Sequence, residues 1–531
     1  MTLTTSPDRE TSAVATPRGL RIAAAGAGIG AGVAGLGAAE LVALVVSATS
    51  GPVEALGSLV INHVPAWLKA LVIAIAGTND KTVLITSLVV VAIVVAAVAG
   101  LVGRIRPIFG VLVTVAAFGI AAVTAATRDG ASGIDALPSL VGLVIAAMVL
   151  TGSVRRIAEW AGSRADTPAR REQAGVERRR FLVFAIVTAG IGAAAASGAL
   201  IVRSAGSAAR AAVAAVKLPK AAVAAPKVPA GASLDVEGIT PLFVPNTDFY
   251  RIDTALVIPT ISPTDWTLKI TGMVKNEVSF SYADILALPL EEHDVTIGCV
   301  SNEVGGDLLG NARWLGYPIR KLLAKAVPAA GADMVLSSSS DGFSAGTPLS
   351  ALTDSNRAAI LAVGMNGDVL PAEHGFPARM IVPGLYGFVS ATKWVVEMKV
   401  STYAQETAYW TSRGWSAKGP IKQSSRIDVP ADGSSVKAGT VTIAGLAWAQ
   451  HTGISKVEVS VDGGAWRAAT LAAEVNPDTW RQWELSWDAQ AGKHTLQVRA
   501  TDAAGTLQTS TIAPTAPNGS SGWDTVSVTV S

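Results

Sequence analysis

The chain has 531 residues, of which 50% are hydrophobic and 15% charged, and its mean hydropathy of +0.43 is too apolar for a wholly soluble protein. A formal net charge of +2, scattered along the chain, argues against nucleic-acid binding, because phosphate recognition needs a concentrated basic face. The one cysteine, Cys299, excludes an internal disulfide, a zinc site of several thiolates and a cysteine-ligated iron–sulfur cluster.

Apolar residues are concentrated in the first two hundred positions. A helix needs roughly 20 apolar residues to cross a hydrocarbon core of about 30 Å. Four runs are that long, and a shorter fifth run holds no charge and is closed by Arg155 and Arg156. The sequence therefore predicts a membrane domain over residues 20–202, with spans at about 20–48, 82–103, 105–126, 137–154 and 180–202.

Basic residues orient these spans. By the positive-inside rule three segments lie in the cytoplasm: the 1–19 tail with Arg18 and Arg21, the turn with Arg104 and Arg106, and residues 155–180. Five spans satisfy this rule if residues 53–77 form only an interfacial or re-entrant segment at the outer face. Everything after residue 203 is then extracytoplasmic.

The last span follows the sequence RRRFL at 178–182. Two arginines, any residue and then Phe-Leu fit the twin-arginine export pattern, whose route carries folded cargo. A basic cytoplasmic flank that needs no export receptor is the alternative interpretation of the same residues.

Beyond the membrane domain the composition changes twice. Residues 203–233 are mostly Ala, Val, Pro and Lys, which indicates a linker. Residues 234–405 mix patterns and predict an α+β domain, with a strand at 266–272, a capped short helix at 281–288 and a helix at 317–327.

Residues 406–531 predict an all-β, immunoglobulin-like sandwich. Strand-like alternation at 457–461 is followed by the turn sequence Asp-Gly-Gly, and 495–500 and 525–530 alternate in the same way. Five tryptophans, Trp448, Trp466, Trp480, Trp483 and Trp487, are available for a core. The fold class is therefore multidomain, and the sandwich by itself indicates no function.

Cys299 lies in TIGCVSNEVGG (296–306), at the end of a strand-like run and before a glycine-containing loop. A thiolate at such a turn could bind a metal or act as a nucleophile. A buried structural cysteine is the alternative, and it is the more frequent fate of a single free cysteine.

The surrounding sequence resembles the sulfite oxidase family of molybdenum enzymes along most of residues 235–530. The matching segments occur in the family's order: FVPN (243–246), FYRID (249–253), the Cys299 loop through NARW (311–314), GMNG (364–367), LP (370–371), HGFPAR (374–379), VPG (382–384) and KW (393–394). The C-terminal sandwich also resembles the dimerisation domain of that family, which implies homodimerisation.

This resemblance implies a molybdenum held by one pterin dithiolene and by the Cys299 sulfur, and a two-electron oxygen-atom transfer. The metal would supply the reaction, while the protein binds, orients and tunes the cofactor. The implied molybdopterin contacts are Asn246, Tyr250 and Arg251 of the first loop, then Asp341, His374, Arg379, Ala391, Thr392 and Lys393. A packing pair in the loop is the structural alternative for His374 and Arg379.

Departures from the family bear on the substrate, for which we expect a small oxo compound. Members that oxidise sulfite surround this anion with arginines, but Pro245 stands at one such position, and Glu303 and Val304 at another. Like charges in a partly desolvated site repel by several kcal/mol at an effective dielectric constant of about 20. Trp415 stands where the family's substrate pocket has a tyrosine. Sulfite is therefore disfavoured and a neutral oxide such as a sulfoxide favoured, with Arg313 and Arg413 left as sources of positive charge.

A separate electron carrier, either a protein or a quinone, is expected. A bis-histidine haem needs two histidines at membrane depth, and only His63 of the five histidines lies in the first 290 residues. No haem site is evident in this chain, and the spans are expected to act mainly as an anchor in membrane lipid.

Two other functions compete with a membrane-anchored oxidoreductase. A cell-surface binding or sensor protein could retain an inactive oxidoreductase fold beside its immunoglobulin-like domain. A five-span transport or assembly module could carry an attached redox domain, but transport usually places polar residues inside the membrane, and the five spans have almost none apart from Glu40.

Overall fold

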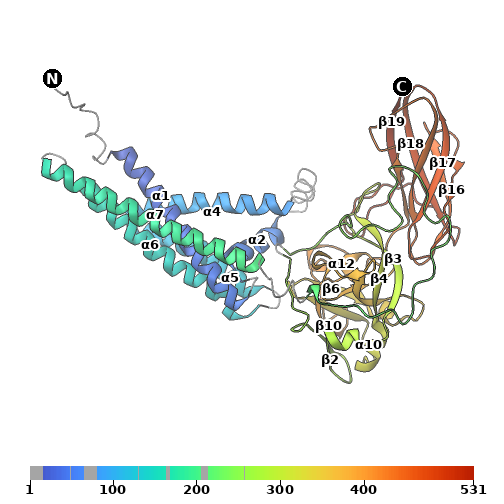
Figure 1. Ribbon diagram of the computed structural model, residues 1–531, viewed down its shortest axis with the longest axis horizontal. Coiled ribbons are helices and arrows are strands. Elements are labelled where there is room, and N and C mark those ends of the chain that lie inside the picture. Colours follow the sequence, from blue (N-terminus) through green and yellow to red (C-terminus); the bar gives the residue numbers. More distant parts are fainter. Residues whose placement is uncertain are drawn as a thin grey trace. The chain divides into compact units, whose positions relative to one another are not determined.

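The computed structural model describes residues 16–47, 50–64, 80–128, 131–162, 168–204, 213–255 and 258–531. The chain forms two compact units, Met1–Gly206 and Ser207–Ser531. The first unit is helical, whereas the second contains all of the described strands (Figure 1).

The first unit is a bundle of apolar helices. Its elements are α1 (Pro17–Val46), α2 (Pro52–His63), α4 (Asp80–Ile105), α5 (Pro107–Thr127), the 3₁₀ helix η2 (Gly133–Ala136), α6 (Leu137–Gly162) and α7 (Pro168–Ser204). Five helical stretches are long and apolar enough to cross a membrane: Pro17–Val46, Val83–Ile105, Pro107–Thr127, Gly133–Ala161 and Gly175–Gly198. The prediction of five apolar helices is confirmed.

Helix α2 has 12 residues, too few to cross the membrane. Residues 65–79 lie outside the described part of the chain, so the course of residues 53–77 stays a prediction. Most of the 1–19 tail lies outside it as well.

Helix α1 packs against α4, α6 and α7 (Figure 1). Small residues allow the close approach: a Cβ added to Gly35 of α1 would lie 2.6 Å from the carbonyl oxygen of Gly142 in α6. Gly28 of α1 is packed in the same way against Gly100 of α4. Helices in lipid associate through such small-residue contacts, because burial of apolar surface no longer drives them together. The glycines and alanines of the first run therefore make α1 the centre of the bundle.

Two five-stranded sheets form the α+β part of the second unit, in the orders β2-β1-β10-β5-β6 and β3-β4-β7-β8, with β9 paired to β7. The strands are β1 (Thr267–Gly272), β2 (Val278–Ser281), β3 (Glu291–Gly298), β4 (Leu309–Pro318), β5 (Met334–Ser339), β6 (Ser344–Pro348), β7 (Ile360–Met365), β8 (Asp368–Val369), β9 (Arg379–Ile381) and β10 (Val395–Ser401). The helices are α9 (Tyr282–Leu286), α10 (Ile319–Ala326), α11 (Leu349–Thr353) and α12 (Gly387–Ser390), with 3₁₀ turns η3 (Ala372–His374) and η4 (Thr411–Arg413).

Local sequence explains two of these helices. Helix α9 begins after Ser281, whose hydroxyl accepts from the Asp284 N–H at 3.1 Å while the Asp284 carboxylate accepts from the Ser281 N–H at 2.8 Å. This capping box satisfies backbone donors that the first turn leaves unpaired. Helix α10 buries Ile319, Leu322 and Leu323 on one face, as its apolar spacing predicts.

The C-terminal part is an all-β sandwich of two sheets, β11-β13-β17-β16 and β12-β19-β18-β14-β15. Its strands are β11 (Ser424–Val429), β12 (Ser435–Val436), β13 (Gly439–Trp448), β14 (Ile454–Val461), β15 (Arg467–Ala468), β16 (Thr470–Leu471), β17 (Arg481–Ala489), β18 (Gly492–Asp502) and β19 (Asp524–Val530). Trp448, Trp480, Trp483 and Trp487 are buried, whereas Trp466 is half-buried and contacts Trp523 edge to face. The predicted combination of apolar helices, an α+β domain and an all-β C-terminal domain is confirmed.

The sandwich shares a hydrophobic core with the α+β part. Trp448 and Trp480 of the sandwich region pack in one cluster with Val295 and Ile297 of β3 and Trp314 of β4. The indole N–H of Trp480 donates to the Leu242 carbonyl at 3.0 Å. The boundary at 405/406 stays a prediction.

The segment expected as a linker also contacts the domain where it is described. Leu218 packs against the α+β core, and Ala232 is buried in the shared cluster. The Ala222 N–H donates to the Leu290 carbonyl at 2.8 Å, just before β3. Residues 205–212 lie outside the described residues, so the 203–233 linker stays a prediction, but its second half lies along the domain.

Candidate active site

A cavity of about 130 Å³ opens at the end of β3, where Cys299 follows the strand. Its lining brings together residues from distant parts of the sequence: Phe249, Tyr250, Ile252, Asp253, Thr254, Ile297, Cys299, Val300, Ser301, Ser339, Asp341, Phe343, Arg379, Gly387, Phe388, Ala391, Lys393, Trp394, Trp410 and Trp415. Of the candidate residues from the sequence, Tyr250, Cys299, Asp341, Arg379, Ala391, Lys393 and Trp415 line this cavity.

Cys299 occupies the turn between β3 and β4. Its N–H donates to the Leu308 carbonyl at 2.8 Å, and its Sγ accepts from the Ser301 N–H at 3.4 Å. Burial raises the pKa of the Cys299 thiol, against the lowering effect of the Ser301 hydrogen bonds and the Lys393 charge. A neutral thiol at this position becomes a strong ligand only when a metal displaces its proton.

Three charged residues of the lining, Asp253, Arg379 and Lys393, form what we call the charged cluster. Lys393 Nζ donates to Asp253 Oδ2 at 3.0 Å and to the Glu373 carbonyl at 2.9 Å. Arg379 donates to the His374 carbonyl at 3.1 Å and the Ala391 carbonyl at 3.4 Å. Burial lowers the pKa of Arg379 to about 10 and that of Lys393 to about 8. Two cations held this deep indicate that an anion completes the site.

His374 lies behind the cavity lining, in the 3₁₀ turn η3, and is 2% exposed. Its Nε2 lies 2.9 Å from the Asn246 carbonyl oxygen, which can only accept, so Nε2 carries the proton. Burial lowers the pKa of His374 to about 4, and the ring is therefore neutral at physiological pH. Its buried Nδ1 has no hydrogen-bond partner among the described residues and is free to accept one.

The segment 246–253 contacts both His374 and the charged cluster. Asn246 accepts at Oδ1 from Asn366 Nδ2 at 2.9 Å, which orients it as a support for His374. Tyr250 lies near both Cys299 and Arg379, and burial raises its pKa. Arg251 is exposed, and its Nε donates to Asp253 Oδ2 at 3.0 Å. Asp253 therefore pairs with both Arg251 and Lys393.

Two further candidates are held by neighbouring side chains. Asp341 accepts from the Thr254 hydroxyl and from the Phe343 N–H, both at 3.3 Å. Thr392 is fully buried and shares a hydrogen bond of 2.7 Å with the Ser337 hydroxyl. Thr392 thus anchors the segment between Ala391 and Lys393 to β5.

The remaining part of the lining is aromatic. We call Phe343, Phe388, Trp410 and Trp415 the aromatic cluster. Trp415 lies 6.2 Å from Trp410 and 6.0 Å from Phe388, measured between ring centroids, and Tyr409 connects Trp410 to Phe343 at 5.1 and 5.7 Å. Indole and phenyl faces of this kind bind apolar or neutral groups and offer no charge to an anion.

Comparisons with known proteins agree with this geometry. Residues 255–410 match the oxidoreductase molybdopterin binding domain, and residues 424–498 match the bacterial Ig domain. Mitochondrial sulfite oxidase from Macaca fascicularis is 29% identical over 337 residues, which cover 54% of this chain and 61% of that enzyme. The human enzyme matches with the same values.

The chain thus spans about three fifths of the length of these curated relatives. Sulfane dehydrogenase SoxCD from Paracoccus pantotrophus aligns with a TM-score of 0.45 and 24% identity, over 50% of this chain and 74% of that one. Residues 255–410 of the α+β part match a molybdopterin-binding oxidoreductase domain, and the chain is similar to sulfite oxidases. The predicted resemblance is thereby confirmed.

The residues of the molybdopterin-binding domain fit that cofactor. Arg379 Nε and His374 Nδ1 are buried nitrogens without a hydrogen-bond partner among the described residues. A buried polar atom that stays unsatisfied costs about 1–3 kcal/mol, so a site with two of them is built for a partner outside the chain. A phosphate-bearing pterin offers acceptors to Arg379 and Lys393 and ring N–H donors to His374, while Cys299 offers a sulfur ligand in the same cavity.

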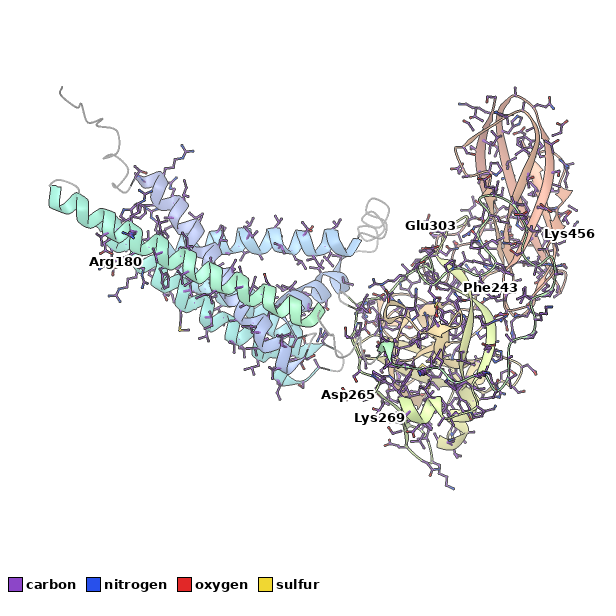
Figure 2. All side chains as sticks on the ribbon, in the orientation of Figure 1. Arg180, Phe243, Asp265, Lys269, Glu303 and Lys456 are labelled. Carbon is purple, nitrogen blue, oxygen red and sulfur yellow. The ribbon has the colours of Figure 1, made fainter. Side chains whose placement is uncertain are left out.

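Three charged residues that the sequence connected with the substrate, Arg313, Arg413 and Glu303, do not line the cavity. Arg313 forms a two-pronged ion pair with Asp294, with N···O distances of 2.8 and 2.9 Å. Arg413 lies over the Tyr409 ring at 3.6 Å and donates to the Tyr409 carbonyl. Glu303 is exposed (Figure 2), so electrostatic repulsion by its carboxylate is not the reason to disfavour an anion here.

Sequence reasoning missed several residues of the lining. Asp253 lies in the FYRID motif, two residues after Arg251, and this spacing was a signal that Asp253 forms an ion pair. Phe343, Phe388 and Trp410 lie in no motif, and only folding brings them beside Trp415.

Proposed function

We propose that this protein is a membrane-anchored molybdenum-cofactor oxidoreductase, with Cys299 as the protein ligand of the metal. One observation carries the proposal: Cys299 shares a single cavity with Arg379 and Lys393, whose charges are buried, in a domain of a molybdopterin-binding family. The cofactor, when bound, supplies a two-electron oxygen-atom transfer.

The chain's own residues hold that cofactor in place. Arg379 and Lys393 bind its anionic part, since charge-assisted donors of this kind suit a phosphate. His374 accepts a hydrogen bond at Nδ1, and Asn246 keeps the ring in that tautomer. Tyr250, Asp341 and the Ala391–Thr392 backbone line or support the pocket. Arg251 assists indirectly, by sharing Asp253 with Lys393.

The substrate we propose is a neutral oxo compound such as a sulfoxide. Arg379 and Lys393 are the only cations among the described residues that line the cavity, and both are assigned to the cofactor. Arg313 is neutralised by Asp294, and Trp415 with its aromatic neighbours replaces a charged substrate pocket. A dianion such as sulfite would lose its hydration there without an ionic partner.

The location we propose is the cytoplasmic membrane, with the second unit on the extracytoplasmic side. Arg104 in the last turn of α4, Arg106 just before α5, and Arg178–Arg180 near the start of the last apolar stretch, Gly175–Gly198, support this orientation by the positive-inside rule. Arg180, which is labelled in Figure 2, lies on α7. Its guanidinium pairs with Glu177 at 3.0 Å. Export through the twin-arginine route, a separate protein or quinone as electron carrier and a homodimer formed through the C-terminal domain are further parts of the proposal.

The first experiment is elemental analysis for molybdenum, together with pterin fluorescence after oxidation. The full chain is purified in detergent from a cofactor-competent host, beside Cys299→Ala. We expect near one molybdenum per wild-type chain and little in the variant.

Loaded protein is then assayed with sulfite and with a dialkyl sulfoxide, using artificial electron donors and acceptors. Turnover of the sulfoxide supports the neutral-oxide proposal, whereas turnover of sulfite alone contradicts it. Well-folded wild-type protein without metal and pterin would contradict the enzyme itself and favour the binding or sensor protein.

A further inference from the structure

The Cys299 loop, residues 299–306, is held from outside its own domain. The hydroxyl of Ser520, from the segment of the sandwich that precedes β19, donates to the Asn302 carbonyl at 2.7 Å. Arg426 of β11 donates to the Gly306 carbonyl, also at 2.7 Å. A Cβ added to Gly305 would lie 2.5 Å from Asp524 Oδ1. Three successive parts of the loop therefore rest on the C-terminal sandwich.

Asn302 transmits this contact to the cysteine. Its N–H donates to the Cys299 carbonyl at 3.1 Å, and its side-chain Oδ1 accepts from the Leu308 N–H at 2.7 Å. The Leu308 carbonyl in turn accepts from the Cys299 N–H at 2.8 Å. Asn302 is buried and thus ties both ends of the Cys299 loop together, and Ser520 fixes Asn302 from the sandwich side.

The same sandwich segment reaches the aromatic cluster. The Pro517 carbonyl accepts from the Ser416 N–H at 3.0 Å, immediately after Trp415. Lys422 Nζ donates to Asn518 Oδ1 at 3.0 Å and to the Gly519 carbonyl at 2.5 Å. Residues 517–520 therefore contact both the cysteine loop and the segment that carries the substrate-side tryptophan.

Little space separates the two domains behind the cysteine. A cavity of about 20 Å³, lined by Cys299 and Asn302 on one side and by Trp448, Gln450 and Ser520 on the other, is the size of one water molecule. At Gly519, an added Cβ would lie 2.6 Å from Tyr386 Oη. The back of the Cys299 loop and residues 517–520 are thus separated by a space no larger than one water molecule.

We infer that residues 517–520 of the C-terminal sandwich are a positioning element of the active site, and that Ser520 is a positioning residue for Cys299. The sandwich then has a role beyond holding subunits together: it sets the direction of the cysteine sulfur. That this sulfur is a metal ligand rests on the proposed function; its positioning by Ser520 does not.

The single cysteine offers a direct test. The full chain is produced in detergent from a host that cannot make molybdopterin, so that Cys299 is free, and its alkylation by iodoacetamide is timed. Ser520→Ala is expected to react about fivefold faster, the factor that corresponds to losing one ordinary hydrogen bond. Ser520→Thr keeps the hydroxyl and is expected to react at the wild-type rate.

Ser521→Ala is the matched control, because the Ser521 hydroxyl donates to the Thr511 carbonyl within the sandwich at 2.8 Å and does not touch the Cys299 loop. We expect this control to react at the wild-type rate. Equal rates in Ser520→Ala and wild type, or equal acceleration in both alanine variants, would overturn the inference.

Cofactor-loaded protein supplies a second measurement. The thiolate-to-metal charge-transfer absorption is expected to shift in Ser520→Ala and not in Ser521→Ala, at equal molybdenum content. A shift in neither variant would overturn the inference for the loaded state. Absence of molybdenum from every variant would instead contradict the proposed function, while the alkylation rates would still decide whether Ser520 positions Cys299.

Discussion

The charged cluster and the aromatic cluster line one cavity but are stabilised in different ways. Asp253, Arg379 and Lys393 are held by hydrogen bonds to carboxylate and carbonyl oxygens, and burial lowers the pKa of both cations. Trp415 contacts Phe388 and Trp410 through its ring, and Tyr409 connects Trp410 to Phe343. In the proposed function, the first cluster binds the anionic cofactor and the second binds the neutral substrate.

The two clusters also differ in where their residues lie in the sequence. The residues toward the cofactor stand in motifs that resemble the family, because one cofactor imposes one set of contacts. The aromatic residues are contributed by segments that lie far apart in the sequence. Substitutions in the two clusters should therefore have different effects.

The largest effect is expected at Cys299, which lines the same cavity as the two clusters. Cys299→Ser should lower turnover by at least about 10³-fold, the order of removing an essential catalytic group, because a hydroxyl is a poor ligand for a soft metal. The melting temperature should change by only a few degrees, as expected for an isosteric exchange. Steady-state kinetics and thermal unfolding measure the two effects. Retained activity with molybdenum bound would contradict the assigned ligand.

The charged cluster is tested by cofactor retention. Arg379→Met should weaken molybdopterin binding by about tenfold to a hundredfold, since a charge-assisted hydrogen bond contributes about 1.5–3 kcal/mol. Molybdenum and pterin remaining after gel filtration measure this loss. Lys399→Met is the control, because Lys399 pairs with Glu406 and does not line the cavity. Equal cofactor loss in both variants would show that Arg379 acts only through stability.

The aromatic cluster is tested by the Michaelis constant. Trp415→Ala should raise KM for an alkyl sulfoxide by about tenfold, because the loss of an aromatic contact is worth about 0.5–1.5 kcal/mol beyond burial. Cofactor content should stay at the wild-type level. Trp466→Ala serves as the control, since Trp466 contacts Trp523 edge to face in the sandwich and does not line the cavity. An unchanged KM in Trp415→Ala would remove the aromatic cluster from substrate binding.

A smaller effect is expected from pH. Burial lowers the pKa of His374 to about 4, below its usual value of 6.5, so the unfolded chain binds a proton between these values that the folded chain does not. The free energy of unfolding should therefore fall as pH drops from about 6.5 towards 4, and His374→Gln should flatten this part of the profile. His293→Gln is the control, with chemical denaturation at several pH values as the measurement. A profile that is the same in wild type and His374→Gln would show that His374 does not titrate in this way.

Much of the charged part of the cavity lining could be predicted from sequence, because its residues lie in short, chemically specific motifs. HGFPAR places His374 and Arg379 five residues apart, and the structure brings them into contact through the Arg379–His374 carbonyl bond. The five apolar helices were equally predictable, since length and composition decide whether a helix can cross a membrane. Arg313 was harder: NARW shows a cation but not that Asp294 lies beside it on β3.

By itself, the sequence determined the order of the domains, the unique thiol and the cation-bearing motifs, because these depend on residue identity and short spacing. The tertiary structure alone decided which charges are neutralised, which aromatic residues share a surface and which loop of the sandwich supports Cys299. Ser520 and Asn302 are separated by 218 positions, yet they share a hydrogen bond. Contacts at such separation arise from the packing of two domains on a common core, which residue patterns along the chain do not record.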